Sequence, residues 1–168
     1  MFSNLRYLEN GTSKQKEVYQ FLTEFGIMNT LAEYSPVLCG TIPLGIDLED
    51  SDLDIILEVK NVDVFKQYVK ALYGQLDGFT MEQSEKYITV TFRHKGFPIE
   101  LYGENTPVKK QQAYMHMVIE NYLMKKDPTL KDKVIKLKKQ GIKTEAAFCE
   151  ILGIKGDPYI GLIEYAKK

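Results

Sequence analysis

The sequence predicts an α+β fold, in which a mixed β-sheet with flanking helices is followed by a C-terminal helical subdomain. Short apolar runs with strand-like alternation lie between residues 36 and 102, interrupted by one segment with helical spacing. From Thr106 onward, the apolar residues recur at helical spacing. We therefore expect a core over residues 1–104 and a helical subdomain over residues 105–168 that packs on it. A chain of 168 residues is long enough to bury a sizeable core.

The N-terminal part is expected to contain three helical segments and two strands. Ser13 can cap the first helix and Gly26 can end it, because serine accepts hydrogen bonds from free helix amides and glycine readily adopts the left-handed conformation. Asn61 can cap the last of the three helices in the same way. The expected elements are helices over residues 13–25, 30–34 and 62–73, a strand over residues 36–39 and a strand over residues 55–57.

A β-hairpin and four helices are expected to complete the chain. Residues 87–92 alternate with period two, residues 94–96 provide a turn, and residues 97–102 return as the second strand. Residues 79–83 are expected to add a further strand. The expected helices cover residues 108–125, 128–140, 144–152 and 157–166.

Two aspartates mark the start of the second strand. Residues i and i+2 of a strand point to the same face, so Asp52 and Asp54 project together while Leu53 projects to the opposite face. Adjacent carboxylates repel each other unless a cation lies between them, and hard cations such as Mg²⁺ prefer oxygen ligands. Upstream, Gly40 and Thr41 offer an open backbone and a hydroxyl to a phosphate. The competing interpretation is an exposed acidic turn in which every carboxylate is solvated.

A third acid, Glu100, lies between two aliphatic residues of the hairpin. Burying a lone carboxylate is costly unless something pairs with it, and a metal shared with Asp52 and Asp54 would supply that partner. The alternative places Glu100 on a solvent-facing side of the hairpin. We expect the three acids to converge on one site.

The net charge of −1 conceals an uneven distribution. Residues 1–104 hold 9 Lys and Arg against 16 Asp and Glu, a net charge of −7, and residues 105–168 hold 13 against 7, a net charge of +6. This split suggests a metal on one side and phosphate or nucleic acid on the other. Electrostatic attraction between the two halves is the equally good alternative.

The composition indicates a cytoplasmic protein without a membrane span. No apolar run approaches the roughly 18 residues that cross a bilayer, and the N-terminus lacks the apolar segment of a signal peptide. Cys39 and Cys149 show no metal-ligand spacing, so we expect both to be reduced and mostly buried. The oligomeric state cannot be predicted from the sequence.

A polar stripe runs along the first C-terminal helix. Lys109, Gln112, His116 and Glu120 recur at helical spacing within an otherwise apolar segment. The stripe faces either a cleft or water, and the sequence does not decide between them. A lone histidine such as His116 is more often a satisfied surface or core residue than a ligand.

The arrangement of a strand, Gly40-Thr41, about ten residues, Asp52-x-Asp54 and the distant Glu100 resembles the nucleotidyltransferase superfamily related to DNA polymerase beta. The whole chain also looks like a small bacterial family of unknown function assigned to that fold. The segments that carry this second resemblance are GTIPLGIDLEDSDLDII, PVKKQQAYMHM, KTEAAF and GDPY. It covers nearly the full length and brings no known reaction.

The superfamily resemblance implies metal-assisted nucleotidyl transfer from a nucleoside triphosphate such as ATP. Asp52, Asp54 and Glu100 would bind Mg²⁺ or Mn²⁺ and form the catalytic group, with Glu100 also able to accept a proton from the attacking hydroxyl. The residues expected to bind the nucleotide are Gly40, Thr41, Ser51, Lys109 and His116.

The chain departs from the superfamily pattern in two places. Thr41 stands where serine or glycine is usual, and residues 42–45 replace a polar, often arginine-bearing turn. This leaves the triphosphate to Lys109 or to another basic residue, such as Lys143 or Arg93.

Three functions from different classes compete. The first is an active nucleotidyltransferase that modifies a hydroxyl of a small molecule or a protein. The second is a relative that binds nucleotide or metal without turnover, and the third is a nucleic-acid-binding adaptor that uses the basic C-terminal half. Retention of all three acids favours the first, and the acidic N-terminal half argues against a nucleic-acid partner.

Overall fold

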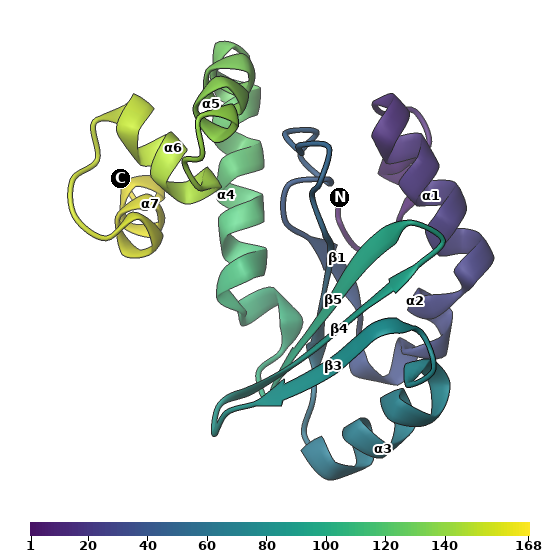
Figure 1. Ribbon diagram of the computed structural model, residues 1–168. Coiled ribbons are helices and arrows are strands. Elements are labelled where there is room, and N and C mark those ends of the chain that lie inside the picture. Colours follow the sequence, from purple (N-terminus) through teal and green to yellow (C-terminus); the bar gives the residue numbers. More distant parts are fainter.

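A five-stranded mixed β-sheet forms the centre of the computed structural model, which describes residues 1–168 (Figure 1). The strand order is β1-β2-β5-β4-β3. Only β2 and β5 are parallel, and the other three pairs are antiparallel. The strands are β1 (Val37–Cys39), β2 (Leu53–Glu58), β3 (Asp77–Gln83), β4 (Tyr87–His94) and β5 (Phe97–Glu104). The predicted α+β fold with a mixed sheet is therefore confirmed.

The N-terminal helices cover one face of this sheet. They are η1 (Arg6–Leu8), α1 (Ser13–Phe25), α2 (Ile27–Thr30), η2 (Ala32–Tyr34) and α3 (Val62–Tyr73). Their apolar side chains bury Leu53, Ile55 and Leu57 of β2, together with Ile99 and Leu101 of β5, in one hydrophobic cluster. The alternation predicted for β2 is thus present, and it directs the even-numbered Asp54 to the opposite face.

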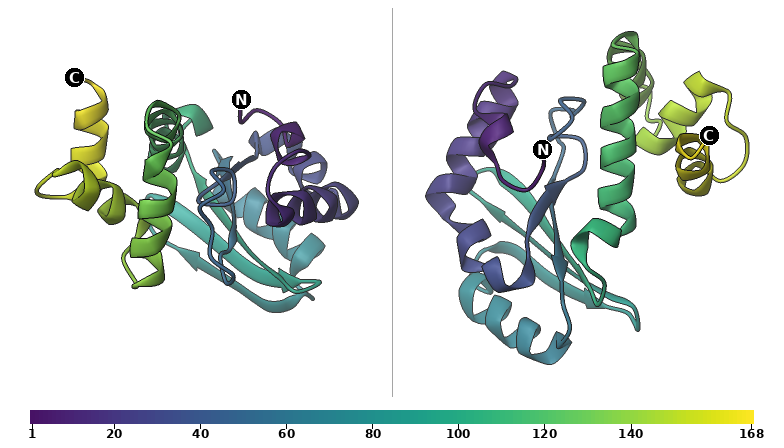
Figure 2. Two further views of the ribbon diagram at one scale, coloured as in Figure 1. Left: turned by 90° about the horizontal axis from the view of Figure 1, so that it is seen from above. Right: turned by 180° about the vertical axis from the view of Figure 1, so that it is seen from behind.

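The C-terminal helices lie on the other side of the sheet (Figure 2). They are η3 (Val108–Lys110), α4 (Gln112–Lys126), α5 (Thr129–Lys139), α6 (Thr144–Leu152) and α7 (Pro158–Ala166). A second hydrophobic cluster joins these helices to Val37, Cys39 and Ile56 of the sheet and to Leu44 and Ile46 of the β1–β2 loop. The division into domains at residue 104 stays a prediction.

The ends of the helices follow the expected capping chemistry, with one correction. Gly26 has φ 71° at the end of α1, and the Asn61 side chain accepts a hydrogen bond from the Val64 amide. Thr12, rather than Ser13, caps α1, because its hydroxyl accepts from the Gln15 amide while the Gln15 side chain accepts from the Thr12 amide.

The long helix predicted over residues 108–125 is interrupted at Gln111. This residue is extended, at φ −70° and ψ 145°, and separates the short η3 from α4. Its buried side chain donates hydrogen bonds to the carbonyl oxygens of Leu57 and Thr106, both at 2.9 Å. The side chain therefore fixes the start of α4 to β2. Helical spacing could not predict the interruption, because the two acceptor carbonyls lie in the sheet and in the preceding loop.

None of the helices combines the length and the apolar character that a bilayer span requires.

Candidate active site

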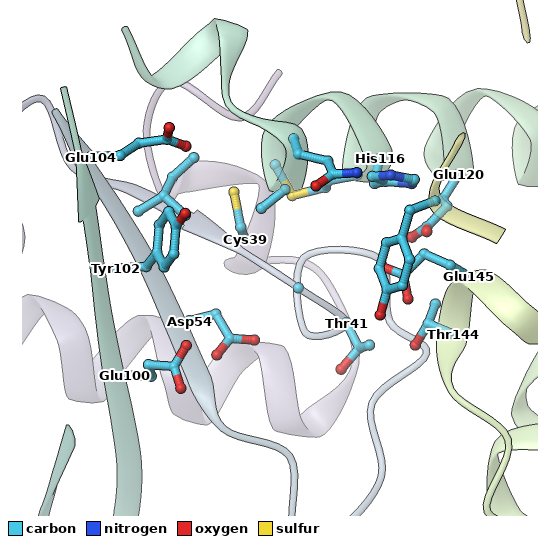
Figure 3. Close-up of a pocket in the computed structure, with 16 residues that line it drawn as sticks. Cys39, Thr41, Asp54, Glu100, Tyr102, Glu104, His116, Glu120, Thr144 and Glu145 are labelled. Carbon is cyan, nitrogen blue, oxygen red and sulfur yellow. The ribbon is translucent and has the colours of Figure 1, made fainter. Parts of the chain in front are cut away.

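Three carboxylates meet on the face of the sheet that is turned toward the C-terminal helices. Asp54 of β2 and Glu100 of β5 are direct partners in the parallel pairing, so their side chains project from neighbouring strands to the same face. Asp52 precedes β2, and one oxygen of each acid lies within 4.8 Å of the others. Figure 3 shows the carboxylates of Asp54 and Glu100 side by side. The structure thus brings together the three acids that the sequence singled out, and their catalytic role stays a prediction.

The electrostatics of this acid group favour a bound cation. The pKa of Asp54 is raised from 3.8 to about 7, chiefly by burial and in addition by the nearby charges of Glu100 and Asp52. The pKa of Glu100 is also raised, mainly by burial and then by Asp52. A divalent cation would compensate the repulsion among the three acids. Because every donor is a carboxylate oxygen, the group fits Mg²⁺ or Mn²⁺ better than a metal that prefers sulfur or nitrogen.

Gly40 allows the Asp54 carboxylate to lie against the turn after β1. The backbone of Gly40 has φ 81°, which glycine adopts at little cost. A Cβ atom at this position would lie 2.5 Å from Oδ2 of Asp54, closer than any real contact. A side chain at residue 40 would therefore displace the carboxylate, so glycine is required here for both its conformation and its size.

The β1–β2 loop is held in place from both sides. Nε2 of Gln15 donates hydrogen bonds to the carbonyl oxygens of Ile42, at 2.8 Å, and Pro43, at 3.3 Å. From the C-terminal side, Nζ of Lys138 donates to the carbonyl oxygen of Ile46 at 2.6 Å. In Figures 1 and 2 the loop lies between α1 and the C-terminal helices.

The loop also brings two hydroxyl groups to the site. Thr41 and Ser51 form a hydrogen bond of 3.5 Å between their hydroxyl oxygens, and Ser51 accepts a second bond of 2.8 Å from the Leu48 amide. Both ends of the loop are therefore close together, next to Asp52 and Asp54.

A cavity of about 420 Å³ separates the sheet from α4, α6 and α7. Gly40, Thr41, Asp54 and Glu100 lie on its sheet side. The opposite wall carries His116 and Glu120 of α4 and Thr144 and Glu145 of α6 (Figure 3). Tyr159 of α7 also lines the cavity. Burial lowers the pKa of His116, and burial together with Glu145 raises the pKa of Glu120 well above its ordinary value.

The polar stripe faces this cavity only in part. Gln112 and His116 line the cavity, and so does Glu120. Lys109 lies before the interruption at Gln111, is exposed, and lines a second hollow beside Pro36 and Val108. The sequence predicted one continuous helix with the four residues of the polar stripe on a single face. The extended backbone at Gln111 interrupts that helix, so Lys109 does not lie on the same face as the other three.

Two residues on the cavity wall opposite the sheet, called the far wall below, were not identified from the sequence. Glu145 and Tyr159 come from α6 and α7, and nothing in their spacing connects them with His116. Glu120 carries a weak signal, because it follows His116 by four residues and therefore shares its helix face. Long-range contacts of this kind depend on how the helices pack, which local patterns do not encode.

Comparison with known proteins gives a family and a set of structural neighbours. The model of a family described as "Domain of unknown function (DUF4269)" matches residues 20–165. No curated protein matches the chain. Thirty-six solved chains have a similar structure.

Three of these structures illustrate the likeness. A cytoplasmic RNA terminal U-transferase has a TM-score of 0.58 and 18% identity, over 76% of this chain and 39% of that one. Cid1, described by its RNA terminal uridylyl transferase activity, has a TM-score of 0.60 and 17% identity, over 76% and 41%. The GLD-2/RNP-8 complex has a TM-score of 0.58 and 14% identity, over 87% and 60%. The chain therefore spans about two fifths to three fifths of each neighbour, and at these identities the likeness concerns the fold.

Proposed function

Since this chain belongs to the family described as a domain of unknown function (DUF4269), and its fold is that of the nucleotidyltransferases, we propose that it transfers a nucleoside monophosphate. The donor is a nucleoside triphosphate such as ATP, the acceptor is a hydroxyl group, and the reaction depends on Mg²⁺ or Mn²⁺. A cytoplasmic location is part of the proposal and rests on the two unpaired, buried cysteines.

The observation that carries the proposal is the acid group beneath the Gly40-Thr41 turn. Asp54 and Glu100 are register partners on parallel strands, and Asp52 completes three oxygen donors within 4.8 Å. These residues would hold the divalent cations. When bound, such cations supply positive charge that stabilises the attacking and leaving oxygens of an in-line displacement. Glu100 is placed in the proposal as the acceptor of the proton that the attacking hydroxyl loses.

The nucleotide is proposed to lie in the cavity, with its phosphates at the turn and its base toward the far wall. Gly40, Thr41 and Ser51 offer a backbone without a side chain and two hydroxyl groups beside the acids. His116 lines the far side of the same cavity. Lys109 lies outside it, so its contact with a phosphate stays a prediction that requires its own test.

The proposed acceptor includes more classes of molecule than the sequence indicated. The charge of the N-terminal half argued against a nucleic-acid partner, and the comparisons do not support that exclusion. Two of the structural neighbours are described as acting on RNA termini. The 3′ hydroxyl of an RNA strand therefore joins small-molecule and protein hydroxyls as a candidate acceptor.

A transfer assay tests the proposal. The protein is incubated with Mg²⁺ and each of four α-³²P-labelled nucleoside triphosphates, with RNA oligonucleotides, polyol metabolites or cell extract as acceptor. We expect metal-dependent pyrophosphate release and label transfer with at least one acceptor, and loss of both in Asp52→Asn and Asp54→Asn. Asp77→Asn, which changes an exposed carboxylate on β3, serves as the matched control.

Nucleotide binding is measured separately with non-hydrolysable triphosphates. Binding that is retained in the control and lost in Asp54→Asn supports the site, and failure of every triphosphate to bind in the presence of Mg²⁺ refutes the proposal. In Lys109→Ala, weaker binding would show that this side chain reaches the phosphates. Unchanged binding would leave the phosphates to the turn and the acid group.

A further inference from the structure

A second group of side chains that could hold a metal ion lies on the wall of the cavity opposite Asp54 and Glu100. His116 and Glu120 are four residues apart on α4, so one turn of the helix directs both to the same face. Glu145 of α6 reaches the same place, and one ligand atom of each residue lies within 4.8 Å of the others. Figure 3 shows the three side chains grouped beside one another, away from Asp54 and Glu100.

Three polar atoms of this second group are buried and lack a hydrogen-bond partner. His116 is 3% exposed and Glu120 is 4% exposed. Both ring nitrogens of His116 and Oε1 of Glu120 are buried and make no hydrogen bond of good geometry, although a backbone group of Tyr159 lies near the imidazole. Because an unsatisfied buried polar atom costs about 1–3 kcal/mol, three of them in one place require an explanation.

No basic side chain neutralises these carboxylates through an ion pair. The only salt bridge in the structure joins Lys60 and Glu58, which belong to the end of β2 and the residues that follow it, not to α4 or α6. The charge of Lys138 acts on Glu120, but the Lys138 ammonium group donates its hydrogen bond to the carbonyl oxygen of Ile46. The buried carboxylate of Glu120 and the partly buried carboxylate of Glu145 therefore lie close together, and neither forms a salt bridge.

We propose that His116, Glu120 and Glu145 bind a transition-metal cation such as Zn²⁺, at a site separate from the Asp52, Asp54 and Glu100 group. The donor set distinguishes the two sites. One imidazole nitrogen and two carboxylate oxygens suit Zn²⁺ and similar cations, whereas three carboxylates suit Mg²⁺. Three protein ligands beside a cavity leave a coordination position free for water or for a ligand in the cavity.

Two features of the surroundings favour this site. The ring of Tyr159 packs edge-on against the His116 ring, at 5.6 Å between centroids and 85° between planes, which restricts the orientation of the imidazole. Glu145 is only partly buried, so the cation has a path from solvent. The bound cation would connect α4 with α6, two helices that are separated along the chain by α5. The inference does not rest on nucleotide transfer.

The histidine content of the chain permits a direct test. His94 and His116 are the only two histidines, so a ¹H–¹⁵N spectrum of the imidazoles contains two residues. His94 lies on β4, where its ring packs against Phe25, and serves as the internal control. On titration of the chelator-treated protein with Zn²⁺, we expect the His116 resonances to change with one equivalent while those of His94 stay unchanged. Resonances of His116 that do not respond to Zn²⁺ would overturn the proposal.

Calorimetry with Zn²⁺ identifies the other ligands. We expect affinity to fall at least about tenfold in His116→Gln and in Glu145→Gln, since even residues that only support a ligand contribute about that much. Affinity should stay within twofold in Asp54→Asn, which alters the first acid group, and in Glu150→Gln, which changes an exposed glutamate on the same helix as Glu145. Circular dichroism verifies that each variant is folded, and Glu145→Gln, at a partly exposed position, covers the case in which the His116 variant does not fold.

The pattern of losses decides the assignment. Zn²⁺ binding that survives in both His116→Gln and Glu145→Gln, or that disappears in Asp54→Asn instead, would refute the second site. Failure of the nucleotidyl-transfer assay would leave this result unaffected, because no nucleotide is present in the titration.

Discussion

Replacing Asp54 with asparagine is expected to stabilise the metal-free protein. The pKa of Asp54 is about 7 in the folded protein against an ordinary 3.8, because the charged form is buried beside Glu100 and Asp52. At about 1.4 kcal/mol for each pH unit of difference, keeping Asp54 ionised in the folded state costs up to ~4 kcal/mol. The side chain is partly exposed and water screens the repulsion, so we expect about half of this, or about 2 kcal/mol. For a chain of this length that corresponds to an increase in Tm of about 4–8 °C at pH 8.

The pH dependence of the free energy of unfolding tests the direction of this effect a second time. A carboxyl whose pKa is raised by folding binds more protons in the folded state between its two pKa values, so stability falls as pH rises through that interval. The free energy of unfolding of the metal-free wild type should therefore decline between pH of about 4 and about 7, and part of this decline should be absent from Asp54→Asn. At pH 3 the two proteins should have nearly the same stability, because Asp54 is then neutral in both states.

Mg²⁺ should make the wild type more stable than Asp54→Asn, the reverse of the order expected without metal. A ligand that binds only the folded state at a concentration of 100 times its Kd adds about 2.7 kcal/mol, which exceeds the estimated cost of ionising Asp54. Differential scanning fluorimetry with EDTA or Mg²⁺ at pH 8 compares wild type, Asp54→Asn and the control Asp77→Asn. We expect the variant to be the more stable with EDTA and the wild type to be the more stable with Mg²⁺. An Asp54→Asn variant that is destabilised with EDTA, or a Mg²⁺ effect of the same size in both proteins, would refute the reasoning.

Three substitutions test the supports of the site by chemical unfolding. Gly40→Ala should cost about 1–3 kcal/mol and weaken Mg²⁺ binding, because alanine is strained at φ 81° and its Cβ would meet the Asp54 carboxylate. Lys138→Met should cost about 1–3 kcal/mol, since it removes a buried hydrogen bond from a charged donor, whereas Lys139→Met at an exposed position should be neutral. Gln111→Ala should cost about 1–3 kcal/mol through the loss of two buried hydrogen bonds.

Each of these expectations has a clear contrary result. Full Mg²⁺ affinity in Gly40→Ala would mean that the turn does not restrict the carboxylate. Equal stabilities of Lys138→Met and Lys139→Met would show that the bond to the loop contributes nothing. For Gln111→Ala, an unchanged midpoint of denaturation would indicate that α4 is fixed to β2 by packing alone.

The acid group could be predicted from the sequence because local rules determine it. Strand alternation separates Asp54 from Leu53 and Ile55, and isolation in an apolar strand marks Glu100. The far wall could not be predicted in the same way. Glu145 reaches His116 only because α6 packs on α5 and α7, which in turn pack on α4, and the extended Gln111 makes bonds to Leu57 and Thr106. Such features depend on tertiary contacts, which carry no period along the chain.

The loop between β1 and β2 has a further consequence for how ligands are admitted. Gln15 of α1 and Lys138 of α5 both donate hydrogen bonds to carbonyl oxygens of this one loop. Swinging the two halves apart would break the Lys138 bond and leave an ammonium group and a carbonyl oxygen without their partners. We therefore expect ligands to bind without a hinge motion between the two halves. The cavity of about 420 Å³ would already have its ligand-bound dimensions, and its size, rather than closure around a substrate, would determine which molecules fit.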